Sequence, residues 1–248
     1  MSQSSPETPQ ISVVVPAYNE AGNVVPLARE IVDALAGRTF EILFVDDCSS
    51  DATRQELIDA KAELPMLRVI SHRVNSGQSR SVRTGVMNAR GAIICTLDGD
   101  GQNPPQDLPI VLDGLTRADA PEDLALVGGD RTANRQDSAW KKFASRAGNG
   151  LRKAMLNDNC ADTGCGLKAF KRSAYLELPY FDHQHRFLPA LMIREGYKCE
   201  FRPVTHRHRT IGTSKYTNFG RLFASLTDIM GVMWLNSRAR NPRGSDEF

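Results

Sequence analysis

Short runs of β-branched and other apolar residues alternate with amphipathic stretches through the first half of the chain. The runs predict five buried strands, over Ile11–Pro16, Glu41–Asp46, Leu67–Ser71, Ala92–Leu97 and Leu124–Gly128. The stretches between them have helical spacing and predict four helices, over Asn23–Leu35, Asp51–Glu63, Ser79–Ala89 and Pro105–Leu115. This alternation is typical of an α/β fold with a mostly parallel central sheet and helices on both faces.

The second half has a less regular pattern. It predicts a basic helix, a strand, a helix, a strand, a basic loop and a last amphipathic helix, over Ser138–Leu156, Gly166–Phe170, Arg186–Glu195, Lys198–Val204, Thr205–Lys215 and Tyr216–Leu235. No linker divides the chain, so we expect one domain over residues 11–215. Residues 1–10 and 236–248 are polar, and we expect a disordered tail and a loose tail there.

The last predicted helix carries an apolar stripe, made of Phe219, Leu222, Phe223, Leu226, Ile229, Met230, Met233 and Trp234. Arg221 and Asp228 interrupt it, which makes it a poor membrane-spanning helix. A tryptophan at its end and arginines at 238, 240 and 243 suit a helix that lies in the interface of an anionic membrane. The alternative is an ordinary amphipathic helix packed on the sheet.

Composition is that of an ordinary globular protein, with 41% apolar and 24% charged residues. The charge is unevenly placed, since residues 1–130 hold 10 Lys/Arg against 19 Asp/Glu and residues 131–248 hold 21 against 10. An acidic half followed by a basic half favours an anionic ligand, with a metal in the acidic part. Nucleic acid, phosphorylated ligands and an anionic membrane all remain open. The five cysteines, odd in number and irregularly spaced, predict reduced thiols.

Polar residues follow the predicted strands, where parallel sheets bind their ligands. These tips are Tyr18-Asn19-Glu20, Asp46-Asp47, His72-Arg73 and Asp98-Gly99-Asp100, and three of the four are acidic. Such a cluster is costly unless a cation or hydrogen-bond donors compensate it. Two carboxylates in the glycine-rich turn after Leu97 suit Mg²⁺ or Mn²⁺. Taken alone, Asp98 and Asp100 are equally compatible with a simple turn.

The chain has neither of two common nucleotide-binding signatures. There is no G-x-x-x-x-G-K-[ST] loop, and no G-x-G-x-x-G follows the first strand. The first strand leads into Pro16-Ala17-Tyr18-Asn19-Glu20 instead.

The ordered motifs resemble a known family. Pro16–Glu20, Asp46–Asp51, Asn75–Gln78 and Asp98–Pro105 look like the inverting family 2 glycosyltransferases of GT-A fold. Asp162-Thr163-Gly164-Cys165-Gly166 and Arg209–Lys215 are similar to the dolichyl-phosphate mannose synthase branch and its bacterial polyprenyl-phosphate relatives. The resemblance covers about residues 10–235. It implies one catalytic domain, with a nucleotide and metal half over 11–130 and an acceptor half over 131–215.

The resemblance also implies roles for individual residues. The base and ribose of a nucleotide-sugar donor are expected to contact Pro16, Tyr18, Glu20, Val45 and Asp47. Asp98, Gly99 and Asp100 are expected at the diphosphate, with Asp98, Asp100 and Gln102 as ligands of Mg²⁺ or Mn²⁺. Arg131 is expected on the donor and the acceptor phosphate, and Arg209 and Lys215 are expected to clamp phosphates.

Two features leave roles open. Asp162 is expected either to orient the acceptor or to act as a base, and a turn cap is the structural alternative. An acceptor phosphate is largely a dianion at pH 7 and needs no strong base, unlike a sugar hydroxyl. Cys48 stands where the family more often has glycine, and Gln78-Ser79-Arg80 where many members have Lys-Gly-type residues, which puts phosphate contact by that loop in doubt.

The leading hypothesis is inverting transfer of a hexose, from GDP-mannose or a UDP-sugar, to dolichyl or undecaprenyl phosphate. The resemblance places the enzyme in the cytoplasm, peripherally associated with the cytoplasmic face of the membrane. A family 2 enzyme that glycosylates a hydroxyl is the first rival, and the absence of the Q-x-x-R-W motif of processive synthases counts against it. The second rival is a non-catalytic module that binds nucleotide sugars or nucleic acid. The acidic strand tips would repel nucleic acid, so no nucleic-acid partner is expected.

Overall fold

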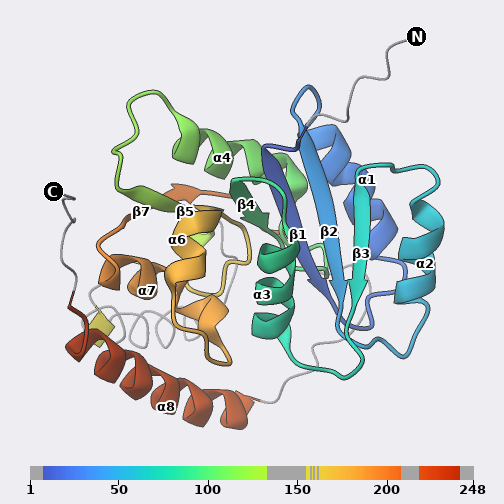
Figure 1. Cartoon of the computed structure of the whole chain (residues 1–248). Helices are drawn as coiled ribbons and strands as arrows, with labels where there is room; N and C mark the ends of the chain where they lie inside the picture. The colour runs from blue at the N-terminus through green and yellow to red at the C-terminus, as the bar shows by residue number, and fades with distance from the viewer. Residues whose placement is uncertain are drawn as a thin grey trace, which may run out of the picture.

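The chain forms a seven-stranded mixed sheet between two layers of helices (Figure 1). The computed structural model describes residues 8–132, 155, 156, 158, 160, 162–207 and 218–240, with side chains in the last range from residue 226 onward. The strands are β1 Ile11–Ala17, β2 Phe40–Asp46, β3 Leu67–Ser71, β4 Ile93–Thr96, β5 Leu124–Asp130, β6 Lys168–Lys171 and β7 Lys198–Pro203. Their order is β3-β2-β1-β4-β6-β5-β7. The α/β fold class predicted from the sequence is confirmed.

Only β6 runs against its neighbours, pairing antiparallel with both β4 and β5. The other pairs, including β5 with β7, are parallel. Each of the seven strands lies within two residues of a predicted one.

The helices of the described residues agree broadly with the predicted ones, and the differences are a short extra helix and two 3₁₀ turns. They are α1 Val24–Ala34, α2 Thr53–Ala60, α3 Gln78–Asn88, α4 Leu108–Thr116, α6 Arg172–Glu177, α7 Leu188–Arg194 and α8 Asn218–Ser237, with 3₁₀ turns η1 Pro105–Asp107 and η3 Gln184–Arg186. The short α6 was not predicted. A 3₁₀ turn precedes both α4 and α7, and each of these helices has a proline in its first turn, as proline prefers. Most of the predicted basic helix over Ser138–Leu156 lies outside the described residues.

Two apolar clusters cover the two faces of the sheet. On one face, α1, α2 and α4 pack through residues such as Leu27, Leu57 and Leu112. On the other, α3, α6, α7 and α8 pack through residues such as Val86 and Tyr175. Helix α3 lies very close to β1, because a Cβ at Gly85 would stand 2.3 Å from Val14 Cγ1.

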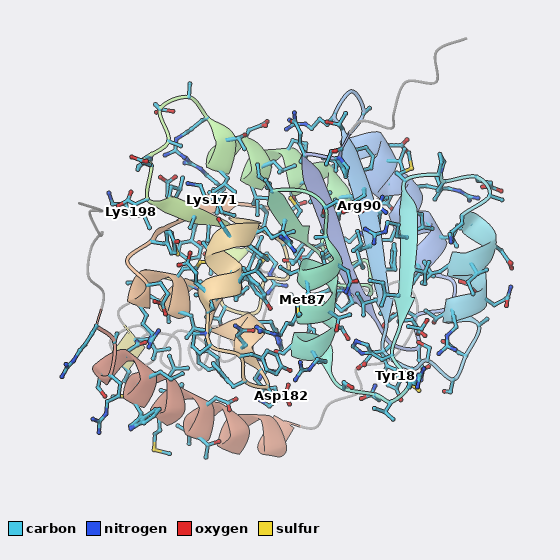
Figure 2. The ribbon with its side chains drawn as sticks, viewed as in Figure 1. Tyr18, Met87, Arg90, Lys171, Asp182 and Lys198 are labelled. Carbon is cyan, nitrogen blue, oxygen red and sulfur yellow. The ribbon has the colours of Figure 1, made fainter. Side chains whose placement is uncertain are left out.

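The parallel strands point their carboxyl ends to one side of the molecule. Figure 2 shows Tyr18, just after β1, at the lower end of the sheet, and Arg90, Lys171 and Lys198 at the opposite end. Lys171 ends the antiparallel β6, whereas Arg90 and Lys198 come before or at the start of parallel strands. The loops that carry the predicted site residues therefore gather at the lower end.

Helix α8 lies along the edge of the α7 layer (Figure 1). Val232 is buried, and Ile229 and Leu235 pack against the same cluster. Leu226, Met230, Met233 and Trp234 are exposed, with 59% of Trp234 accessible to solvent. Four members of the predicted stripe therefore share an exposed face, whereas Val232, which the stripe did not include, faces the core. None of the helices in the described part of the chain is long and apolar enough to cross a membrane.

Candidate active site

The loop after β1 is held by a ladder of hydrogen bonds. The four successive backbone N–H groups of residues 19–22 donate to oxygens of the second βα unit, namely Ser49 Oγ (2.9 Å), Thr53 Oγ1 (2.8 Å), Asp51 Oδ2 (3.2 Å) and Glu56 Oε2 (2.8 Å). Asn19 is held with a positive φ of 52°. The ladder fixes the predicted nucleotide-binding loop before any ligand arrives.

The other predicted donor residues lie around this loop. Tyr18 is partly exposed at the surface, and Pro16 lines a pocket below it. Glu20 accepts a hydrogen bond from Asn23 at 2.9 Å. Val45 is fully buried in β2, and its contact with the donor stays a prediction.

Asp47 joins the ends of β2 and β3. Its carboxylate accepts backbone hydrogen bonds from Ser76 (2.9 Å) and Gly77 (2.7 Å), and His72 Nδ1 lies 2.7 Å from Oδ1. Gly77 has a φ of 84°, a conformation that side chains resist. Asp47 therefore shapes the loop before α3, and its contact with the ribose stays a prediction.

Asp98 lies at the centre of the site, in the turn after β4. It accepts hydrogen bonds from Gln78 Nε2 at 2.7 Å and from Asn103 Nδ2 at 3.3 Å. Burial raises the pKa of Asp98, and the charge of Asp100 raises it further. Gln78 was left in doubt by the sequence, and the structure places it directly on this carboxylate.

Two glycines let the turn pack this tightly. A Cβ at Gly99 would stand 2.7 Å from the backbone oxygen of Pro16, and one at Gly166 would stand 2.3 Å from Asp98 Oδ2. The loop at 162–166 from the second half thus lies directly against the acidic turn from the first half.

The donor set of this turn suits a hard divalent cation. Asp98 and Asp100 stand two residues apart, and Asp100 Oδ1 accepts the backbone N–H of Gln102 at 3.1 Å. No group of three or more His, Cys, Asp or Glu that could hold a metal occurs within the described ranges. Two carboxylates fit Mg²⁺ or Mn²⁺, which completes its oxygen shell with ligand phosphates and water, better than they fit zinc.

Arg131 and Asp162 form a bidentate ion pair across the loops after β5 and before β6. The guanidinium Nε lies 2.7 Å from Oδ2 and Nη2 lies 2.9 Å from Oδ1, while the backbone N–H of Arg131 also donates to Oδ2 at 3.3 Å. Burial alone would lower the pKa of Arg131, but the hydrogen bonds and charge of Asp162 raise it above its ordinary value. The structure thus joins two residues whose roles were predicted separately.

Arg207 is a residue that sequence reasoning missed. Its guanidinium pairs with both carboxylate oxygens of Glu30 on α1 (2.9 and 3.1 Å), and Nε donates to the backbone oxygen of Gly101. Its backbone N–H donates to Gln102 O at 3.1 Å. Arg207 therefore ties the chain after β7 to the acidic turn. No local signal could reveal a pair separated by 177 residues. The predicted clamp residues Arg209 and Lys215 lie outside the described residues.

Comparison with known proteins agrees with this arrangement. The family model described as glycosyl transferase family 2 matches residues 12–178. The chain belongs to glycosyl transferase family 2. The family predicted from the ordered motifs is confirmed.

Two curated relatives of this family 2 chain act on polyprenyl phosphates, by their names. The undecaprenyl-phosphate 4-deoxy-4-formamido-L-arabinose transferase of Enterobacter sp. (strain 638) is 36% identical over 225 residues, covering 89% of this chain and 66% of the relative. The dodecaprenyl-phosphate galacturonate synthase of Rhizobium johnstonii is 33% identical over 234 residues, with 91% and 67% covered. The chain thus spans about two thirds of their length.

Solved structures share the fold. Glucosyl-3-phosphoglycerate synthase from Mycobacterium tuberculosis has a TM-score of 0.66 at 17% identity, covering 94% of this chain and 82% of that one. The same enzyme has been solved with Mn²⁺, UDP and its product, again with a TM-score of 0.66 and 17% identity, covering 94% and 81%. The family 2 chain therefore has the GT-A-like architecture expected of it.

Proposed function

We propose that this family 2 protein transfers a sugar from a nucleotide-diphosphate donor to a polyprenyl phosphate, with inversion and with a divalent cation. The observation that carries the proposal is the identity of 33–36% to two polyprenyl-phosphate glycosyltransferases over about nine tenths of the chain. The motifs at the carboxyl edge and the carboxylate turn support it.

The first half supplies the donor site. The backbone ladder at residues 19–22 gives a fixed shelf for the base and ribose beside Pro16, Tyr18 and Glu20. Asp98 and Asp100 would hold the cation, with Gln102 beside them. When bound, Mg²⁺ or Mn²⁺ neutralises the charge that develops on the departing nucleotide diphosphate.

The second half supplies positive charge for the acceptor. Arg131 is oriented by its two bonds to Asp162, so its guanidinium is fixed without a ligand. An acceptor phosphate dianion needs positioning and no strong base. A carboxylate in a bidentate pair with arginine is a poor proton acceptor, which favours the orienting role for Asp162. Arg209 and Lys215 complete the phosphate clamp in this proposal.

The lipid is reached from the membrane surface. The exposed face of α8, formed by Leu226, Met230, Met233 and Trp234, would lie in the interface at the cytoplasmic face. Arg238 and Arg240 follow directly and would meet anionic headgroups.

Lipid analysis provides the test. Purified protein is incubated with undecaprenyl phosphate, Mn²⁺ and one of UDP-glucose, UDP-galacturonate or GDP-mannose. The lipid is then extracted and its mass is measured by mass spectrometry. The proposal expects one donor to add one sugar mass to the lipid. Transfer to a hydroxyl acceptor with no glycosylated lipid phosphate would contradict it, and so would donor binding without transfer from any donor.

A further inference from the structure

A pocket opens beneath the acidic turn and contains residues that none of the roles above uses. It is lined on its polar side by Gln78, Thr96, Asp98, Lys168 and His185 and on its apolar side by Pro16, Val82, Leu97 and Leu188. The residues come from β1, β4, α3, β6 and the turn before α7. The pocket therefore joins the two halves of the site.

His185 enters this pocket with one ring nitrogen already occupied. Nδ1 lies 2.6 Å from Ser79 Oγ on α3, and the backbone N–H of His185 donates to the same Oγ at 3.3 Å. Ser79 is only 1% exposed. Among the described residues its hydroxyl hydrogen has no acceptor other than Nδ1, and a buried donor is costly to leave unpaired.

The hydrogen bond from the Ser79 hydroxyl determines the tautomer of the His185 ring. If the hydroxyl donates to Nδ1, the single ring proton of the neutral imidazole stays on Nε2. Burial lowers the pKa of His185 well below its ordinary value, and the charges of Arg186 and Lys168 lower it further, so the ring is neutral. Nε2–H has no hydrogen-bond partner within the part of the chain that the structure describes.

The size of the pocket favours a single hydroxyl group, because a cavity volume of about 20 Å³ has room for one hydroxyl or water and not for a whole sugar ring or a phosphate. The pocket combines a carboxylate, an ammonium, an amide and a hydroxyl with an apolar wall. A sugar hydroxyl is small enough to enter, and it can donate to the Asp98 carboxylate while it accepts a hydrogen bond from a ring N–H. Lys168 already donates to the backbone oxygen of Cys165, so its charge is partly engaged.

We propose that His185 binds a hydroxyl oxygen of the transferred sugar through Nε2–H, and that Ser79 positions the ring for this contact. His185 then contributes to the choice of sugar, not to the chemistry of transfer. The inference rests on the proposed function, since it takes the group that enters the pocket to be a hydroxyl of the donor's sugar.

The first experiment tests the tautomer without any ligand. Nitrogen NMR of the histidine side chains in the full chain at pH 7 distinguishes a protonated Nε2 from a protonated Nδ1. The His185 signals, assigned by their loss in His185→Asn, are expected to show protonation at Nε2, and Ser79→Ala is expected to shift Nδ1. A proton on Nδ1 in the wild type would overturn the proposal.

The second experiment isolates the sugar contact. Calorimetry measures binding of UDP-glucose, UDP-galacturonate and GDP-mannose in Mn²⁺, each against UDP or GDP alone. An asparagine can occupy the position of Nδ1 and a glutamine that of Nε2, so His185→Asn is expected to weaken the bound nucleotide sugar about tenfold with unchanged binding of the bare nucleotide. His185→Gln is expected to retain most of the affinity.

The outcomes separate the two proposals. If the wild type binds a nucleotide sugar and His185→Asn binds it equally well, the role of His185 is wrong and the proposed function stands. If the wild type gains no affinity from any of the three sugars over the bare nucleotide, the role of His185 is overturned, and the proposed function is decided separately by the lipid-transfer assay. Equal losses of nucleotide and nucleotide-sugar binding in His185→Asn would show a structural role only, and thermal unfolding of each variant would confirm it.

Discussion

The two halves of the site are organised in different ways. In the nucleotide loops of the first half, acidic and hydroxyl side chains are bound mainly to backbone N–H groups, as in the ladder at residues 19–22 and two of the three contacts of Asp47. In the second half, charged side chains pair with each other, as Arg131 does with Asp162. Backbone-anchored groups shape a fixed cradle, whereas paired side chains orient charges that a ligand can share. The difference suits a donor site formed in advance and an acceptor site completed by its substrate.

The largest effect is expected in the acidic turn of the first half. Asp100→Ala removes one of the two carboxylates at the cation site and should lower transfer by about 10³-fold or more. Within the described part of the chain, its side chain accepts one local bond from the backbone of Gln102, so the thermal unfolding midpoint should change little. Transfer is measured over a titration of Mn²⁺. Undiminished activity of the variant in the presence of a chelator would remove the metal assignment.

The next effect concerns Arg209 and Lys215. Lys215→Ala should lower turnover by about tenfold or more, because a donor that stabilises phosphate charge is lost. Arg209→Ala should behave alike. Basic side chains in a loop, which the sequence predicts here, add little to stability, so neither variant should unfold earlier. Wild-type turnover in both would contradict the clamp, and a large loss of stability would mean that these side chains pack in the structure.

Variants of Asp162 distinguish an orienting role of its carboxylate from a role as a general base. Asp162→Asn keeps the shape but loses the charge that orients Arg131, and we expect about a tenfold loss of turnover with a raised KM for the lipid. Breaking a buried pair costs about 3 kcal/mol, so Asp162→Ala should also lower the free energy of unfolding. A general base would behave differently, because its loss would reduce kcat by orders of magnitude at unchanged KM.

A variant of Glu30 tests whether the pair between Glu30 and Arg207 affects the cation site in the acidic turn. Glu30→Gln weakens the fork on Arg207, which holds the backbone of Gly101 and Gln102, and should raise the Mn²⁺ concentration for half-maximal activity a few-fold. Arg29 lies on the same helix as Glu30, and Arg29→Gln, which loses only an exposed pair with Glu63, is the control that should leave metal dependence unchanged. Identical metal curves for the Glu30 and Arg29 variants would mean that Arg207 is a surface tie only.

The sequence predicts the first half better than the second for a physical reason. Buried parallel strands appear as apolar runs, and the strand ends then identify Asp98, Asp100 and their neighbours. The reversal of β6 depends on its packing between β4 and β5, which no local pattern encodes. The six-residue α6 is too short for its periodicity to be recognised. The pairs Arg131–Asp162 and Glu30–Arg207 join residues 31 and 177 positions apart, so only the fold brings them together.

The smallest effect per residue is expected at the membrane surface. Each arginine after α8 should add roughly 1 kcal/mol of attraction to an anionic bilayer, less at high salt. The change to Arg238, Arg240 and Arg243 together, each to alanine, should reduce flotation with anionic liposomes strongly but leave weak binding through the exposed face of α8. A chain that ends before Tyr216 should not float at all.

A matched control distinguishes a docking surface from a general effect of charge. Arg90 and Lys171 lie at the end of the sheet opposite Tyr18 (Figure 2), and Lys61 lies between the end of α2 and the start of β3. Replacing all three with alanine removes the same charge. If α8 faces the membrane, this control floats as the wild type does, because charges about 10 Å or more from the bilayer are screened at physiological salt. Equal losses in the two triple variants would mean attraction by net charge alone. The exposed side of α8 would then be assigned to contact with another protein. The two halves of the chain would differ only in how they build the active site.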